Sequence, residues 1–189
     1  MKRIAIVGIQ GVPAQYGGFE TLVENLIEKK SDPEIEYTVY CSARDYSVKM
    51  ARYKGARLRY IPLFHANGVE SMPYDIISMI RSAKGYDTVM ILGVSGCIFL
   101  PVFKRMCHGK VIVHIDGREH TRAKWGKRAR RFLKKSEEIA VKYADTIIAD
   151  TEIIRDYVTD SYGRDSELIA YGGDHVLRGV PKDRQREIL

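Results

Sequence analysis

A glycine-rich turn joins an apolar segment to an amphipathic one near the start of this chain, and it constrains the fold more than any other feature. Ile4–Val7 is uniformly apolar, and apolar side chains recur every three or four residues over Phe19–Lys30, which predicts a strand followed by a helix. Glycines let backbone N–H groups approach an anion, and the first helical turn adds unpaired donors. The pattern favours an anion site at Gly17 and Gly18, although glycines that only turn the chain would explain it as well.

The glycine spacing argues against one common ligand. The glycines of this turn stand at positions 8, 11, 17 and 18, which does not match the G-x-G-x-x-G pattern of dinucleotide-binding turns. We therefore do not expect NAD to bind here.

Strand-like and helix-like segments alternate along the chain. The expected strands are Ile4–Gly8, Tyr37–Ser42, Arg57–Pro62, Thr88–Gly93, Val111–Asp116, Thr146–Ala149 and Glu167–Tyr171; the expected helices are Phe19–Lys30, Tyr74–Lys84, Cys97–Met106, Lys127–Tyr143 and Glu152–Tyr162. This alternation predicts an α/β, Rossmann-like, doubly wound and mainly parallel sheet of about seven strands flanked by helices. Ligands of such sheets gather at the carboxyl ends of the strands.

The length and the cysteines narrow the setting. A chain of 189 residues suits one α/β domain and is short for two. The three cysteines form no C-x-x-C pair, so neither a disulfide framework nor a zinc site is indicated, and a reducing cytosol is expected. The histidines and carboxylates show no metal-ligand spacing either, so no metal site is expected.

Four segments together resemble glycosyltransferase family 4, and in particular its bacterial rhamnosyltransferase-like branch. Gly11–Glu24 is similar to its N-terminal loop, and Asp116–Trp125 matches its D-G-x-E-x-x-R-x-K-W pattern. Ala144–Glu152 and Ile169–Asp174 are similar to the end of the first domain and to the approach to the interdomain linker.

The resemblance implies a domain organisation and an activity. Residues 1–175 would be the N-terminal, acceptor-side domain of a two-domain GT-B enzyme and 176–189 the start of the linker, with the C-terminal donor-binding domain absent, so this chain alone is expected to be inactive. The enzyme would be a retaining hexosyltransferase that moves a sugar, with rhamnose as a candidate, from a nucleotide-sugar donor to a lipid-diphosphate-linked glycan in surface polysaccharide synthesis. The donor is a substrate and no cofactor is implied.

The resemblance also implies roles for residues. Gly17 and Gly18 would lie against the donor phosphates, and His114 would contact the donor sugar or its phosphate. His114 and Asp116 alternate with Val113 and Ile115 at the end of an expected strand, so the side chains of His114 and Asp116 lie on the same face. Asp116 would orient or deprotonate the acceptor hydroxyl. A turn capped by Asp116 is the alternative. The acceptor diphosphate would meet three charged side chains, namely Glu119, Arg122 and Lys124.

Positive charge is concentrated in one segment. Residues 118–135 contain nine Lys or Arg and one Glu, while the whole chain carries a net charge of +7, so the rest is close to neutral. On a helix from Lys127, an aromatic and basic surface would face outward: Trp125, Lys127, Arg128, Arg130, Arg131, Lys134 and Lys135. This surface suits an anionic inner membrane leaflet and predicts a cytoplasmic, peripheral protein. A merely solvated helix is the alternative, and nucleic acid is not expected because no stacking aromatics or recognition motif accompany it.

A second function stays open from the sequence. The chain could be a non-catalytic Rossmann-like module that binds an anionic membrane or a nucleotide. A dehydrogenase or epimerase is disfavoured by the missing glycine fingerprint and by the lack of a late Tyr-x-x-x-Lys pair.

Overall fold

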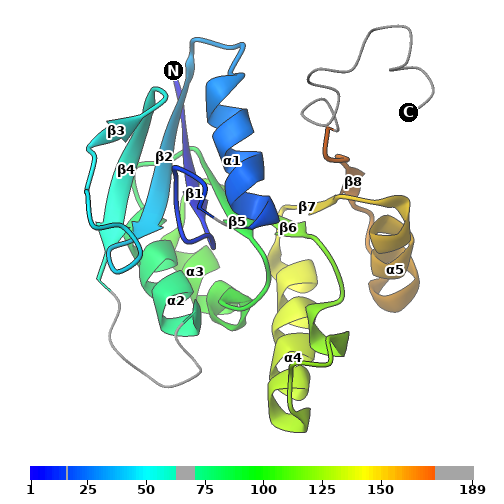
Figure 1. The fold of residues 1–189 in the computed structure, drawn as a ribbon. Coiled ribbons are helices and arrows are strands. Elements are labelled where there is room, and N and C mark those ends of the chain that lie inside the picture. Colours follow the sequence, from blue (N-terminus) through cyan, green and yellow to red (C-terminus); the bar gives the residue numbers. More distant parts are fainter. Residues whose placement is uncertain (16, 63–70, 173–189) are drawn as a thin grey trace, which may run out of the picture.

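The computed structural model describes residues 1–15, 17–62 and 71–172, which form one eight-stranded sheet with helices on both faces (Figure 1). The strands are β1 (Lys2–Val7), β2 (Ile35–Ser42), β3 (Arg52–Tyr53), β4 (Ala56–Ile61), β5 (Thr88–Leu92), β6 (Lys110–Ile115), β7 (Thr146–Ala149) and β8 (Glu167–Leu168). Their order across the sheet is β3-β4-β2-β1-β5-β6-β7-β8. The expected linker at 176–189 lies outside the described residues.

The sheet is parallel apart from one edge. Strand β1 pairs with both β2 and β5, and β6 pairs with β5 and β7, all in parallel register. Only the two-residue β3 runs antiparallel, against β4, and the two are joined by a turn at Lys54 and Gly55 with positive φ angles of 45° and 84°. The doubly wound, mainly parallel sheet is confirmed, with this added edge strand making eight instead of the expected seven.

Two helical layers cover the sheet. Helix α1 (Gly18–Glu28) packs Val23 and Ile27 on one face. The other face carries α2 (Ser71–Ser82), α3 (Leu100–Met106), α4 (Lys127–Tyr143) and α5 (Glu152–Tyr162), whose buried side chains form a second core. Short 3₁₀ turns, η1 (Cys97–Phe99) and η2 (Glu119–Thr121), precede α3 and α4. Burial of these two cores supplies the main stabilising free energy.

The topology brings the sequence motifs to one edge. The carboxyl ends of β1, β5, β6 and β7 are adjacent in the sheet, so the loops that follow them are neighbours. His114 of β6 is in register with Leu92 of β5 and Ile148 of β7. Within the described part of the chain, no helix is long and apolar enough to cross a membrane.

Candidate functional site

The glycine turn after β1 is held in shape by two carboxylates of α1. Glu20 Oε1 accepts the backbone N–H of Gln10 at 2.9 Å, and Glu24 Oε2 accepts that of Ala14 at 2.8 Å. Gly17 has a φ of 118°, and a Cβ atom there would overlap the Glu20 carboxylate. The turn is thus fixed by the helix that follows it. Glycine is required at position 17 because of the positive φ angle and because of the close approach of the Glu20 carboxylate.

Gly18 is the open part of this turn. A Cβ atom at Gly18 would meet no described atom within 4 Å, and Gly17 is the N-cap of α1 without a side-chain cap. The N–H groups of the first helical turn have no partner within the helix, which makes this end suitable for an anion. The buried Glu20 adds a negative charge to the same turn, so the cations that neutralise a diphosphate have to come from other elements.

A groove of about 710 Å³ runs along α1 from these glycines. Its described lining residues are Gly17, Gly18, Thr21, Leu22, Asn25, Leu26, Lys29, Lys30, Ser31, Asp32, Ile35, Tyr37, Tyr171 and Gly172. The groove therefore joins the expected phosphate site to the segment that follows β8. Its volume is in the range of small-molecule sites.

His114 lies at the carboxyl end of β6, between two aromatic rings. Phe19 of α1 and Tyr171 contact its imidazole edge-on, with ring centroids 5.1 Å and 5.7 Å away. The side chain is only 3% exposed, and its Nε2 atom has no hydrogen-bond partner among the described residues. Burial lowers the pKa of His114, and the charge of Asp150 opposes this shift. Neutral imidazole is therefore the favoured form near pH 7.

Asp116 directly follows β6, two residues beyond His114, and is half-buried. Burial raises its pKa above the ordinary value, the nearby Arg122 opposes this shift, and Glu119 and Asp150 reinforce it. A carboxylate with a raised pKa is a better proton acceptor, which fits the expected role. The structure thus brings Asp116, Arg122 and Glu119 together, as the motif predicts.

Glu119 gathers the remaining residues of the motif. Its carboxylate pairs with Arg122 Nε at 2.6 Å and with Lys124 Nζ at 3.0 Å, and it accepts a hydrogen bond from Trp125 Nε1 at 2.9 Å. Burial would raise the pKa of Glu119, but these hydrogen bonds and charges outweigh it and hold the pKa below its ordinary value. Arg122 and Lys124 are about half exposed, so both can still meet a ligand.

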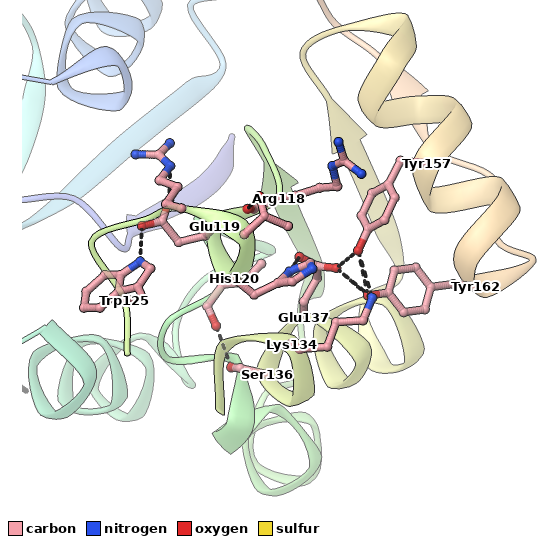
Figure 2. A network of polar contacts seen from close by, with 12 residues as sticks. Arg118, Glu119, His120, Trp125, Lys134, Ser136, Glu137, Tyr157 and Tyr162 are labelled. Carbon is pink, nitrogen blue, oxygen red and sulfur yellow. Dashed lines mark hydrogen bonds and ion pairs between the residues drawn. The ribbon is translucent and has the colours of Figure 1, made fainter. Parts of the chain in front are cut away.

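A buried cluster that the sequence analysis missed anchors this loop to the domain (Figure 2). Glu137 of α4 is fully buried, and its carboxylate accepts hydrogen bonds from the hydroxyls of Tyr157 and Tyr162 of α5. His120 Nδ1 of η2 lies 3.2 Å from the same carboxylate. The helical spacing held a signal for it, because Glu137 stands four residues after Leu133 and three before Ala140 on the buried stripe of α4, whereas Glu138 does not. A helical Glu usually faces solvent, so its residue type points the other way.

Lys134 corrects part of the expected basic surface. Its ammonium donates to the hydroxyls of Tyr157 and Tyr162 at 2.8 Å and 2.6 Å, and it lies 3.6 Å from Glu137. It turns into the cluster because that buried carboxylate needs a counter-charge. The outward position expected for Lys134 is wrong.

The other basic residues of α4 divide into two groups. Arg130 donates to the backbone oxygens of Trp125 and Arg122, so it holds the loop, and Lys135 pairs with Glu138. Lys127, Arg128 and Arg131 are exposed and their side chains form no ion pair or hydrogen bond among the described residues. Arg130 and Lys135 are exposed too, so Lys134 is the expected basic position of α4 that turns inward, and we call the three residues without a partner the exposed basic triad.

Asp150 stands directly before the N-cap of α5 and is not the cap itself. Thr151, not Asp150, is the N-cap of α5, and its Oγ1 accepts the N–H of Ile154 at 3.3 Å. The Oδ1 atom of Asp150 is buried without a hydrogen-bond partner among the described residues. Helix capping therefore explains Thr151 but leaves Asp150 unexplained.

A second polar pocket of about 360 Å³ opens beside the glycine turn, and its lining includes Gln10, Ser42, Asp75 and Ser95. Asp75 of α2 is 5% exposed and accepts a hydrogen bond from Ser95 Oγ. Burial raises the pKa of Asp75 to about 7, and the Ser95 hydrogen bond opposes this shift.

The three cysteines are free, and Cys97 is buried in the core, where burial raises its pKa. Among the described residues, no group of three or more His, Cys, Asp or Glu side chains is arranged to hold a metal ion.

Solved structures share this fold at low sequence identity. Sucrose-phosphate synthase from Thermosynechococcus elongatus matches all of this chain and 53% of its own, with a TM-score of 0.73 and 16% identity. HepE of Anabaena, in complex with UDP, matches 99% of this chain and 50% of its own, with a TM-score of 0.59 and 11% identity. UDP-N-acetylglucosamine 2-epimerase from Rickettsia bellii matches 100% of this chain and 51% of its own, with a TM-score of 0.57 and 16% identity.

This chain therefore spans about half the length of each of these structures, and the likeness establishes the Rossmann-like fold. No curated protein matches the sequence. A family model does match residues 1–174, which include every described residue. The chain belongs to the family described as "Domain of unknown function (DUF1972)".

Proposed function

We propose that this chain is the N-terminal, acceptor-side domain of a retaining glycosyltransferase. The enzyme transfers a sugar, with rhamnose as the candidate, from a nucleotide-sugar donor to a lipid-diphosphate-linked glycan at the cytoplasmic face of the membrane. The observation that carries the proposal is the ring contact between Phe19 and His114. It joins the helix start after Gly17 and Gly18 to the strand that leads into the Asp116–Trp125 loop, so both motifs of the resemblance meet at one edge.

The proposed chemistry uses these residues in distinct roles. The donor diphosphate lies at the open helix start, and the bond between the sugar's anomeric carbon and this leaving group breaks. Asp116 accepts a hydrogen bond from the attacking acceptor hydroxyl, and its raised pKa favours this contact. Arg122 and Lys124, which Glu119 holds beside Asp116, bind the acceptor diphosphate.

The comparisons support a nucleotide-sugar substrate at the level of chemical class. One structure of this fold is a complex with UDP, and another is named for a UDP-sugar. The third is named as a synthase of sucrose phosphate. Because the epimerase shares the fold, the fold by itself does not select sugar transfer, and the choice rests on the Asp116–Trp125 loop.

The membrane part of the proposal rests on the exposed basic triad beside Trp125. Each Lys or Arg close to an anionic leaflet contributes on the order of 1 kcal/mol. Three such charges, with Lys124 about half exposed nearby, support reversible peripheral binding next to a lipid-linked acceptor.

Turnover of sugar nucleotides tests the proposal. The complete product of the gene is assayed with UDP-glucose, UDP-galactose, GDP-mannose and dTDP-rhamnose and a lipid-diphosphate acceptor, beside its Asp116→Asn variant. We expect sugar transfer from one donor, at least a hundredfold lower turnover in the variant, and no transfer by the 189-residue chain alone. Transfer that is unaffected by Asp116→Asn would remove Asp116 from the chemistry, and sugar epimerisation without transfer would refute the reaction.

One observation favours a second candidate, a non-catalytic module that binds an anionic membrane. Most of the net positive charge of the chain lies in residues 118–135. Vesicle binding by a complete gene product that turns over none of the four donors would support this candidate over the enzyme.

A further inference from the structure

Two buried polar atoms without partners lie at the ends of neighbouring strands, and the proposed chemistry gives Asp150 no role. They are Nε2 of His114, at the end of β6, and Oδ1 of Asp150, which directly follows β7. His114 is in register with Ile148, and Asp150 stands two residues further on, so both side chains lie on the same face of the sheet. The charge of Asp150 also opposes the lowering of the His114 pKa by burial, in keeping with this placement.

Such a pair is unfavourable unless something binds it. A buried donor or acceptor that has lost water without gaining a protein partner destabilises the folded state, and such groups concentrate at functional sites. The imidazole Nε2 and the carboxylate Oδ1 together offer complementary partners for a hydroxyl group, which can donate its proton to the carboxylate and accept a hydrogen bond from the imidazole Nε2–H.

Tyr171 separates this pair from the groove along α1. Its ring contacts His114, with centroids 5.7 Å apart, and it also lines the 710 Å³ groove, whereas His114 is not among the described lining residues. Tyr171 is 42% exposed, so one partly solvated side chain covers a buried imidazole. Gly17 and Gly18 line the same groove, which places the expected diphosphate on the groove side of Tyr171.

We propose that a hydroxyl of the donor sugar replaces the Tyr171 ring over His114 and is held between His114 Nε2 and Asp150 Oδ1. This inference rests on the proposed function and adds Asp150 as a residue that selects the sugar, and Tyr171 as its cover. The bare nucleotide diphosphate does not reach this subsite, so Asp150 discriminates a nucleotide sugar from its nucleotide.

The kinetic test uses the complete enzyme and its Asp150→Asn variant. The matched control is Asp156→Asn, at an exposed position of α5. A hydrogen bond to a charged group is lost in Asp150→Asn, so we expect KM for the active nucleotide sugar to rise about tenfold to a hundredfold. The dissociation constant of the corresponding nucleoside diphosphate should stay within twofold of wild type, and Asp156→Asn should match wild type throughout. Equal weakening of sugar nucleotide and bare nucleotide, or no weakening, would overturn the subsite.

Stability separates binding from a structural role. Because Asp150 Oδ1 has no partner in the described structure, Asp150→Asn should unfold at the same urea concentration as wild type or at a higher one. A clear loss of stability would mean that Asp150 supports the fold instead. A wild-type enzyme that turns over none of the four donors would remove the proposed function together with this inference, whereas an active wild type with an unaffected variant would remove this inference alone.

The cover is tested on the 189-residue chain by site-resolved carbethoxylation of histidines. His108 is exposed and serves as the internal reference. We expect His114 to react at least tenfold more slowly than His108 in wild type. In Tyr171→Ala, the reaction rate of His114 should approach that of His108. Unchanged protection of His114 in that variant would show that Tyr171 is not its cover.

Discussion

The indole of Trp125 and the carboxylate of Glu119 are joined by a hydrogen bond of 2.9 Å, and Lys124 reaches the same carboxylate oxygen. Glu119 is thus the centre about which the loop after β6 is arranged. Its single negative charge holds two cations and an aromatic ring in place, and the group keeps a net positive charge.

Removing Glu119 should disorganise this loop. In Glu119→Ala, Arg122 and Lys124 lose their common partner and become free to adopt other rotamers, so the proposed acceptor site is no longer preorganised. We expect KM for the lipid-diphosphate acceptor to rise about tenfold while KM for the sugar donor changes little. Glu138→Ala, which removes an exposed ion pair with Lys135, is the control. An unchanged acceptor KM would contradict the arrangement.

The exposed basic triad should control membrane binding. Changing Lys127, Arg128 and Arg131 together to Glu reverses the charge at positions that hold no part of the fold, so vesicles rich in anionic lipid should no longer be bound. Co-sedimentation with anionic and neutral vesicles measures this. The matched control reverses three exposed charges elsewhere, at Lys49, Lys84 and Arg105, and should retain binding. Equal loss in both triple variants would mean that net charge alone is responsible.

Glu137 should be far more important for stability than its neighbour. Glu137→Ala leaves Lys134 beside two tyrosine hydroxyls without the carboxylate, and breaking such a buried arrangement costs about 3 kcal/mol or more. Glu138→Ala at an exposed position should cost less than about 1 kcal/mol. Urea unfolding of both variants gives the comparison, and similar midpoints would show that the cluster contributes little.

Asp75 should make the wild-type protein less stable as the pH rises. Burial raises its folded pKa to about 7, above the ordinary value of 3.8, so between these values the folded state binds more protons than the unfolded state, and stability falls as pH increases through this window. The full difference is on the order of 4 kcal/mol. Asp75→Asn should lack this component. The free energy of unfolding should therefore fall more between pH 5 and pH 8 in wild type than in Asp75→Asn. An equal change in both proteins would refute the raised pKa.

The sequence predicted the repeating part of the fold well. Apolar periodicity defined α4 at Lys127–Tyr143 and α5 at Glu152–Tyr162 with the bounds that the structure has, because both helices bury one continuous stripe. Strand β3 was missed because two residues are too short to show a period. Strand β8 ends at Leu168 instead of Tyr171, and Tyr171 packs on His114.

The site was predictable where one motif supplies all of its parts and not where distant elements meet. Asp116, Glu119 and Arg122 stand within seven residues, so the loop pattern names them. The Glu137 cluster draws on η2, α4 and α5, and the position of Asp150 on the same face of the sheet as His114 depends on the register of β6 and β7. Burial of a carboxylate is decided by tertiary packing, which its residue type alone does not encode.

Two glutamates of α1 tie the turn after β1 to the helix that follows it. Glu20 and Glu24 accept the N–H groups of Gln10 and Ala14, and neither carboxylate is among the described lining residues of the groove along α1. Gly17 and Gly18, by contrast, do line that groove. The path of the turn and the lining of the groove therefore depend on different residues, so a substitution at Glu20 or Glu24 alters the first without removing a side chain from the second.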